Sequence, residues 1–368
     1  MRVGVPREVK DNENRVGLTP DGAAALVMEG HEVVIERGAG AGCGFADSAY
    51  EAAGAAIGSA KEAWASTLVI KVKEPLESEY TFLGGQILLT YLHLAGAEGS
   101  LTHALLDAGT TAIAYETVED ENGRLPLLAP MSAVAGSMAP LMGSYYLAKF
   151  NGGRGTLIGE ILGEPHGKVV IVGDGIVGRH AAKVAGAMGA RSVVLFGLNP
   201  ERAGEFERSI PRLRYEFSTP EALAPELSDT DLLVGAVLIL GARAPRVVTA
   251  DMVRSMPEGS VIVDVSIDQG GCIETSRPTS HSDPVFVEHG VTHYCVTNMP
   301  GAFPRTSTLA LTAATLPYVL RIANGGIDAV LEDPGFVKGI NMRGGRITCK
   351  PVAEALGLER LYADVRGR

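Results

Sequence analysis

Short apolar runs alternate along this chain with longer segments whose apolar residues recur at helical spacing. The short runs predict strands buried on both faces, and the longer segments predict helices that cover them. The strands are expected at residues 2–5, 32–36, 68–71, 86–90, 111–114, 169–172, 192–196, 231–234 and 260–265. The pattern therefore predicts an α/β protein with doubly wound parallel sheets.

A glycine-rich turn follows the strand predicted at 169–172 and precedes a helix that includes 181–188. Its GxGxxG spacing lets the backbone turn tightly and approach a pyrophosphate, and the helix start offers free N–H groups to phosphate. A purely structural turn is the alternative. We predict a dinucleotide site that includes Gly173, Gly175, Ile176, Val177 and Gly178.

This nucleotide-binding unit lies in the middle of the chain. Before it, small and apolar residues at 133–148 predict a buried connecting helix, and 156–166 form a glycine-containing lead-in to the strand at 169. After residue 304 the pattern changes to a long helix at 307–324 and a short one near 352–356. We expect a dinucleotide-binding Rossmann domain at 131–304, inserted into a discontinuous substrate domain formed by 1–130 and 305–368.

The end of the strand at 192–196 bears on the choice of cofactor. Rossmann domains carry an acidic residue there that bonds the adenosine ribose of NAD. This chain has Gly197, followed by Asn199 and Arg202, which can bond the oxygens of a 2′-phosphate. The sequence thus predicts NAD(P)H as cofactor with a preference for NADP(H). In the alternative, Glu201 binds the ribose and Arg202 is a solvated residue at a helix start.

Composition narrows the classes of partner. The chain has 368 residues, 46% of them apolar, and a formal charge of −11, which argues against nucleic acid or an anionic membrane as partner. No apolar run is long enough to span a bilayer, and the charged start lacks a signal-peptide pattern. The four cysteines show no metal-ligand spacing, and Cys272 is expected to be a small buried residue. We therefore expect a cytoplasmic enzyme without a metal.

Polar residues at the ends of apolar strands are the candidates for chemistry. Such residues are expected in a cleft where the two domains face each other. Arg15 can clamp a small carboxylate. Lys73 closes the strand run that starts at Leu68, and Lys71 lies two residues earlier on the same strand face, so periodicity does not choose between them. His93 ends the apolar strand that starts at Gln86, and Asp268 ends the one that starts at Val261. Taken singly, each has a structural alternative: surface charges, a hydrogen-bonded histidine, or an Asx turn.

Ordered motifs along nearly the whole chain resemble the bacterial alanine dehydrogenases. They are Met1-Arg-Val-Gly-Val-Pro-Arg-Glu8, Asn14-Arg-Val16, Lys71-Val-Lys-Glu-Pro75, Thr90-Tyr-Leu-His-Leu-Ala95, Ala114-Tyr-Glu-Thr117, Leu127-Leu-Ala-Pro-Met-Ser132, Gly235-Ala-Val-Leu238, Asp268-Gln-Gly-Gly-Cys272 and Asn298-Met-Pro300. The resemblance implies an inserted nucleotide domain, a homohexamer, and reversible oxidative deamination of L-alanine to pyruvate and ammonium.

Carried over position by position, the resemblance gives these candidates roles. It implies that Arg15 holds the substrate carboxylate and Lys73 a substrate oxygen, that His93 is the acid/base, and that Asp268 is the catalytic aspartate. It also implies nucleotide contacts for Ser132, Ser218, Val237, Leu238 and Asn298, and places Met131 and Met299 near the nicotinamide and substrate.

The chain departs from the family pattern at two positions. Gly197 replaces the usual Asp, and Ala133 replaces a Glu, so a carboxylate near the predicted cleft is missing. The loss of this charge either alters substrate choice or only simplifies a helix start. These departures leave open a reductase or dehydrogenase of the same family that acts on a different oxoacid, amino acid or imine. Two other classes fit less well. A transhydrogenase subunit has no need for Lys73 and His93, and a non-catalytic nucleotide sensor needs none of the four polar residues.

Overall fold

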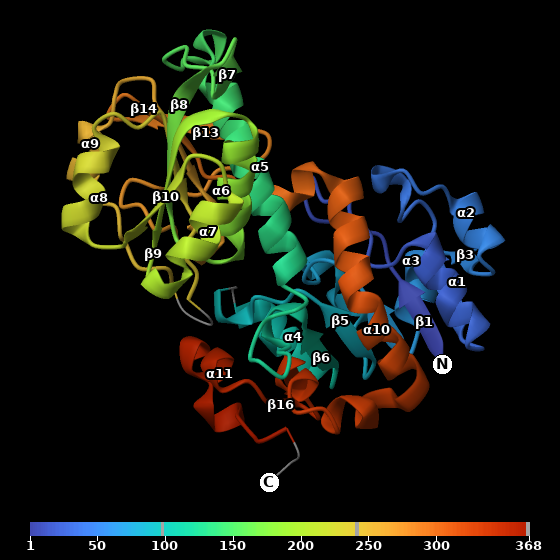
Figure 1. Cartoon of the computed structure of the whole chain (residues 1–368). Helices are drawn as coiled ribbons and strands as arrows, with labels where there is room; N and C mark the ends of the chain where they lie inside the picture. Colours follow the sequence, from blue (N-terminus) through green and yellow to red (C-terminus); the bar gives the residue numbers. More distant parts are fainter. Residues whose placement is uncertain (97–98, 240–242, 366–368) are drawn as a thin grey trace. The chain divides into compact units, whose positions relative to one another are not determined.

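The computed structural model describes residues 1–96, 99–239 and 243–365. The chain divides into two compact units, Met1–Met131 with Gly301–Arg368, and Ser132–Pro300. Each unit is built on a mostly parallel sheet with helices packed against it (Figure 1). The predicted α/β class with two Rossmann-like sheets is confirmed.

The sheet of the first unit has the strand order β16-β15-β6-β5-β4-β1-β2-β3. Its six parallel strands pass outward from β1 in two directions, so the order reverses between β1 and β4. Ligands bind at such switch points, outside the carboxyl ends of the strands. The strands are β1 (Arg2–Val5), β2 (Glu32–Glu36), β3 (Ala56–Gly58), β4 (Leu68–Ile70), β5 (Ile87–Thr90), β6 (Thr111–Ala114), and the antiparallel pair β15 (Ile340–Arg343) and β16 (Arg346–Ile347).

Helices flank this first sheet. Three of them, α3 (Ala60–Trp64), α4 (Gly99–Asp107) and α11 (Lys350–Leu356), contribute to one buried apolar cluster with strands β4 to β6. The others are α1 (Pro20–Met28), α2 (Asp47–Ala52) and α10 (Pro304–Leu331), and α1 contacts both α2 and α10. The helix predicted at 307–324 is longer in the structure, because Pro304 suits its first turn and Gly326 absorbs a kink at φ +63°.

The second unit has the order β10-β9-β8-β11-β12-β14-β13, and β7 pairs with β8. This parallel core matches the order of dinucleotide-binding folds, with its switch point between β8 and β11. The strands are β7 (Gly159–Ile161), β8 (Glu164–Val172), β9 (Ala190–Gly197), β10 (Leu213–Phe217), β11 (Leu232–Gly235), β12 (Val261–Asp264), β13 (Val285–Glu288) and β14 (Val291–Tyr294).

The helices of the second unit cover both faces of its sheet (Figure 1). One apolar cluster joins the sheet to α5 (Ala129–Leu147), α6 (Ile176–Ala187) and α7 (Ala203–Ser209). A second cluster on the other face joins it to α8 (Pro220–Leu227) and α9 (Ala250–Ser255). Alternate residues of β8 point to opposite clusters, as buried parallel strands require.

Several elements differ from their predicted limits. The lead-in at 156–166 is a hairpin, because Leu162 and Gly163 turn the chain with positive φ and start β8 at Glu164. The connecting helix begins at Ala129, and it is not fully buried, since Leu141 and Tyr145 are exposed. The strands β5 and β12 end at Thr90 and Asp264. His93 and Asp268 therefore lie on the segments that follow these strands.

Candidate active site

The glycine turn lies at the switch point of the second sheet. Gly173 has φ +111°, and an added Cβ would lie 2.4 Å from the carbonyl oxygen of Ala236, beyond β11. At Gly178 an added Cβ would lie 1.8 Å from the oxygen of Gly173. Both positions therefore require glycine for the close approach of strands and helix.

Open space remains where the pyrophosphate would bind. An added Cβ at Gly175 meets nothing within 4 Å among the residues that the structure describes. Gly175 is also the N-cap of α6, so it has no side chain to occupy the N–H groups of Ile176 and Val177. A helix start with free N–H groups attracts an anion. The turn thus fits a dinucleotide phosphate.

The tip of β9 carries the residues predicted to choose the cofactor. Gly197 is buried, and its carbonyl oxygen accepts a hydrogen bond from the Ser218 N–H at 2.9 Å. The Asn199 side chain caps the 3₁₀ helix η6 (Pro200–Arg202) by accepting from the Glu201 N–H. Arg202 donates to the backbone oxygen of Asp174 at 3.2 Å. The groups predicted to cradle a 2′-phosphate are thus bonded within the protein.

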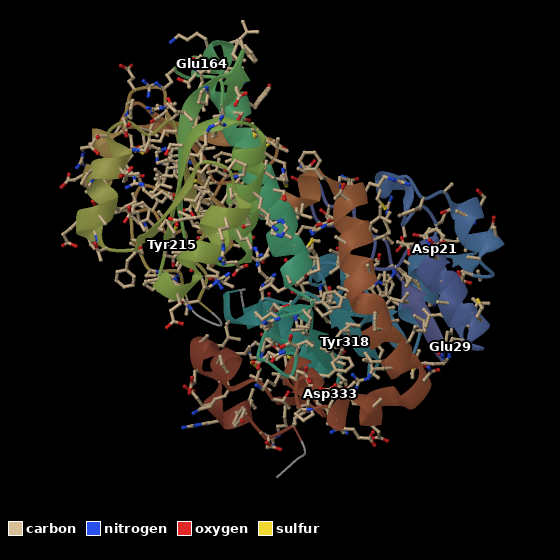
Figure 2. The ribbon with its side chains drawn as sticks, viewed as in Figure 1. Asp21, Glu29, Glu164, Tyr215, Tyr318 and Asp333 are labelled. Carbon is tan, nitrogen blue, oxygen red and sulfur yellow. The ribbon has the colours of Figure 1, made fainter. Side chains whose placement is uncertain are left out.

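Asp174, inside the glycine turn, was not among the predicted site residues. Its Oδ2 accepts a hydrogen bond from the Tyr215 hydroxyl at 3.0 Å and lies 3.8 Å from Nη1 of Arg202. Tyr215 lies on β10, where Figure 2 labels it. A carboxylate therefore lies beside the strand tip that carries Gly197.

The loop that carries Asp268 is held by a buried carboxylate. Asp264 accepts N–H bonds from Ser266, Cys272 and Ile273 at 3.0, 3.0 and 3.3 Å. An added Cβ at Gly271 would lie 2.8 Å from its Oδ2, which explains one of the two glycines. Burial raises the pKa of Asp264. Asp264 thereby fixes both ends of the segment around Asp268.

Asp268 itself is exposed on the 3₁₀ helix η7 (Val265–Gln269). Its Oδ1 accepts the N–H of Asn298 at 3.2 Å, so the carboxylate bonds across the fold, and the Asx turn considered from the sequence is not the contact observed. Asn298 has φ +58° and precedes the buried Met299. The structure thus brings Asp268 and Asn298 together.

Other predicted nucleotide contacts lie on a loop and on helix α5 of the same unit. The oxygen of Val237 accepts from the Ser266 hydroxyl at 2.8 Å, which ties the segment after β11 to η7. Leu238 follows with an exposed side chain, and Ser132 lies partly exposed on α5. Their contacts with a nucleotide stay predictions.

At the switch point of the first sheet, a buried charge cluster joins the ends of β1 and β4. Lys71 Nζ lies 3.1 Å from Glu8 Oε2 and 2.8 Å from Glu79 Oε1, with no exposed side-chain surface on the lysine. Glu8 also accepts the N–H of Val72 at 2.6 Å. Burial lowers the pKa of Lys71, but the two carboxylates outweigh it and raise the pKa above its ordinary value. Lys71 is therefore a structural cation.

Lys73, two residues later, has different neighbours. Its Nζ lies 5.9 Å from the ring centroid of Tyr91, and the residue is buried, so it is not the surface charge considered from the sequence. Strand periodicity did not choose between Lys71 and Lys73, but their contacts in the structure distinguish them. Lys71 is committed to two carboxylates, and Lys73 is the candidate for the substrate.

Arg15 is also buried, and a pair of contacts fixes its guanidinium. Nε donates to Glu13 Oε1 at 2.7 Å, and Nη2 bonds to Glu13 Oε2. Nη1 lies 3.0 Å from the sulfur of Met131. Burial opposes the charge, but the Glu13 carboxylate prevails and raises the pKa of Arg15. The structure thus brings Arg15 and Met131 together around a permanent cation.

His93 follows β5 with φ +48° and a half-exposed side chain. Its ring stacks on Tyr91, with centroids 5.6 Å apart and planes 3° apart. The carboxylate of Glu116, from the 3₁₀ helix η4 (Tyr115–Thr117) after β6, accepts the backbone N–H of His93 at 2.6 Å. The same carboxylate lies 3.9 Å from Nδ1. Tyr91 and Glu116 therefore set the position of the imidazole.

Known proteins and family models match this chain over nearly its full length. The model "Alanine dehydrogenase/PNT, N-terminal domain" matches residues 4–135, and "Alanine dehydrogenase/PNT, C-terminal domain" matches 139–350. The alanine dehydrogenase of Bacillus subtilis is 49% identical over 369 residues, covering 99% of this chain and 97% of the relative. The chain belongs to the alanine dehydrogenase family.

Further relatives match the chain in sequence and in structure. The alanine dehydrogenase of Halomonas elongata is 48% identical, with 99% of each chain covered. A solved L-alanine dehydrogenase superposes with a TM-score of 0.92 at 48% identity, covering 97% of this chain and 99% of that one. A transhydrogenase from Sinorhizobium meliloti shares the fold with a TM-score of 0.82, at 23% identity.

Four residues that position the candidate site residues were not predicted from the sequence: Tyr91, Glu116, Asp174 and Tyr215. Tyr91 and Glu116 lie inside sequence motifs that resemble the family, and Asp174 lies inside the glycine turn. The sequence therefore marks these three positions. Their contacts depend on tertiary packing.

Other classes of site find no support in the described residues. No group of three or more His, Cys, Asp or Glu among them can hold a metal ion, and no helix among them is long and apolar enough to cross a membrane. All four cysteines are free, and burial raises the pKa of Cys272 well above its ordinary value. Cys272 therefore has the environment of a packed, unreactive thiol.

Proposed function

We propose that this protein catalyses the reversible oxidative deamination of L-alanine with NAD(P)+ and water to pyruvate, ammonium, NAD(P)H and a proton. The observation that carries the proposal is a set of contacts in the first unit: Arg15 lies against Met131, and Lys73 and His93 both lie against the ring of Tyr91. Family membership supplies the reaction type, and this grouping supplies the cations and the proton carrier that an amino acid needs.

Arg15 and Lys73 bind the substrate and stabilise the negative charge on its oxygens. Arg15 is held charged and oriented by Glu13, which suits it to bond the substrate carboxylate. Lys73 is buried beside the Tyr91 ring, where its ammonium can bond the carbonyl oxygen of pyruvate. A buried donor aimed at a developing oxyanion gains strength from the low dielectric around it.

Proton transfer falls to His93. Oxidation of alanine gives an imine, water adds to the imine carbon, and ammonia leaves as the C–N bond breaks. Each step moves a proton to or from nitrogen or oxygen, and imidazole is the side chain most often used for this. Glu116 fixes the backbone of His93, and the stacked Tyr91 ring fixes its plane.

Residues of the second unit serve the cofactor. The nicotinamide supplies the hydride acceptor at one carbon, and the protein supplies its orientation. Gly173, Gly175 and Gly178 provide the pyrophosphate turn, and Asp268 is assigned the stabilisation of cationic intermediates. The sequence predicts a preference for NADP(H) from Gly197, Asn199 and Arg202, whereas the Asp174 carboxylate beside Arg202 favours NAD(H).

The first experiment is initial-rate oxidation of NADH and of NADPH with pyruvate and ammonium. Turnover that depends on both substrates is expected, and an absence of turnover despite cofactor binding would contradict the alanine reaction. A panel of other 2-oxoacids and cyclic imines then tests the alternative substrates that the missing family carboxylate at Ala133 leaves open.

We also propose that the chain assembles with copies of itself, as a homohexamer by family resemblance, in the cytoplasm. Apolar side chains lie exposed on one stretch of the second unit, with Tyr145 53% and Phe150 81% exposed and their rings 6.1 Å apart. Two exposed aromatic rings in contact make this stretch a candidate for a surface that another copy of the chain covers.

Light scattering coupled to size-exclusion chromatography tests this assembly. The wild-type chain, at 38.4 kDa per copy, is expected to elute as a hexamer. A Tyr145→Ser/Phe150→Ser variant should lower the mass, and a Phe217→Ser variant, changed at an exposed phenylalanine on β10, is the matched control. A monomeric wild-type protein would contradict the proposal.

A further inference from the structure

The glycine at the tip of β9 makes room for another residue's carboxylate. A Cβ built at Gly197 would lie 2.2 Å from the Tyr215 hydroxyl oxygen, 2.5 Å from Cγ of Asp174 and 2.6 Å from its Oδ2. Real Cβ atoms do not approach other atoms this closely. A side chain at position 197 is therefore incompatible with Asp174 and Tyr215 where they stand.

This contact places the Asp174 carboxylate where Rossmann domains use one. An aspartate at 197 would carry its carboxyl carbon about 1.5 Å beyond Cβ. The carboxyl carbon of Asp174 is 2.5 Å from that Cβ position, so the two carboxylates would lie within about 4 Å of each other. Asp174 comes from the turn after β8 and supplies the charge that the end of β9 lacks.

The carboxylate is held from one side. The pKa of Tyr215 is raised to about 12 by burial, so its hydroxyl keeps the proton that it donates to Oδ2 of Asp174. The same hydroxyl oxygen accepts the N–H of Asn199 at 3.0 Å, which ties the loop after β9 to this group. Among the residues that the structure describes, no donor bonds Oδ1 of Asp174.

Arg202 is fixed by the same arrangement. Its Nη1 bonds the backbone oxygen of Asp174, and its guanidinium lies 4.7 Å from the ring centroid of Phe206. Phe206 in turn stacks on Tyr215, with centroids 5.9 Å apart. The cation that the sequence assigned to a 2′-phosphate therefore lies against a carboxylate that would repel that phosphate.

We propose that Asp174 is the residue that binds the adenosine ribose hydroxyls and selects NAD(H) over NADP(H), with Gly197 as the space that admits it. The inference rests on the proposed function, since it assigns the nucleotide end of the same site. A carboxylate accepts hydrogen bonds from the ribose diol and opposes a 2′-phosphate through like charge.

Calorimetric titration of the full chain with ADP-ribose and with 2′-phospho-ADP-ribose tests the assignment without turnover. The wild-type protein should bind ADP-ribose at least tenfold more tightly. Asp174→Asn keeps the shape and removes the charge, so the ratio of the two Kd values should move towards the phosphorylated ligand by about tenfold or more. Glu201→Gln, the other acid near the strand tip, is the matched control and should leave the ratio unchanged.

Results that contradict the role of Asp174 differ from those that contradict the proposed function. Tighter binding of 2′-phospho-ADP-ribose by the wild-type chain, an unchanged ratio in Asp174→Asn, or an equal shift in Glu201→Gln would overturn the role of Asp174 alone. Failure of the wild-type chain to bind either ligand would remove dinucleotide binding, and the proposed function with it. If Asp174→Asn does not fold, Tyr215→Phe replaces it: loss of the positioning hydroxyl should weaken ADP-ribose severalfold, and unchanged binding would overturn the proposal.

Discussion

Replacing His93 with asparagine should lower kcat for pyruvate reduction by about 10²- to 10⁴-fold, the usual contribution of a general acid/base. Asparagine is chosen because residue 93 has φ +48°, a conformation that asparagine tolerates better than alanine. The side chain is half exposed and its backbone N–H bond to Glu116 is kept, so the fold should survive. Steady-state rates with saturating cofactor, pyruvate and ammonium measure the loss.

Two readouts separate a catalytic role from a structural one. Calorimetric binding of ADP-ribose and the melting temperature of His93→Asn should equal those of the wild-type chain. His103→Asn, changed at an exposed histidine on α4, is the matched control and should keep full activity. Retained turnover in His93→Asn would remove this residue from the mechanism.

The sequence predicts the fold well because both sheets are mostly parallel. Buried parallel strands such as β1 and β9 are short, nearly continuous apolar runs, and their limits agree closely with the prediction. The hairpin of β7 and β8 was missed because most of β7 and the first residues of β8, from Glu164, are exposed and lack a continuous apolar run. Positive φ at Leu162, a residue with no turn preference, gives no sequence signal.

The candidate site shows the same division between local and tertiary information. The residues at strand ends, such as Lys73 and His93, could be proposed because strand and turn patterns are local. The pairing of Lys71 with Glu8 and Glu79 could not, because it depends on how three separate segments pack. The prediction from Gly197 considered only the strand it ends, and the carboxylate of Asp174 enters from a different loop.

Lys71→Met should mainly lower the stability of the fold, and Lys73→Met should mainly lower catalytic activity. Lys71→Met leaves the carboxylates of Glu8 and Glu79 buried without their cation, and breaking a buried pair costs about 3–5 kcal/mol. The melting temperature should fall by about 10 °C, as followed by circular dichroism. Lys73→Met should melt near the wild-type temperature, and its kcat/KM for pyruvate should fall by about 10²-fold or more.

A rescue variant tests the cause of the Lys71 effect. In Glu8→Gln/Lys71→Met/Glu79→Gln none of the three changed positions carries a charge, and a glutamine at position 8 keeps an oxygen for the Val72 N–H. Removing all the members of a buried ionic cluster is often neutral, so most of the lost melting temperature should return. An unchanged melting temperature in Lys71→Met, or a loss of stability in Lys73→Met as large as that in Lys71→Met, would contradict the division of roles. Lys71 and Lys73 lie two positions apart, have the same side chain and are both buried. A difference between the two variants therefore comes from the partners of each lysine: two carboxylates for Lys71 and the Tyr91 ring for Lys73.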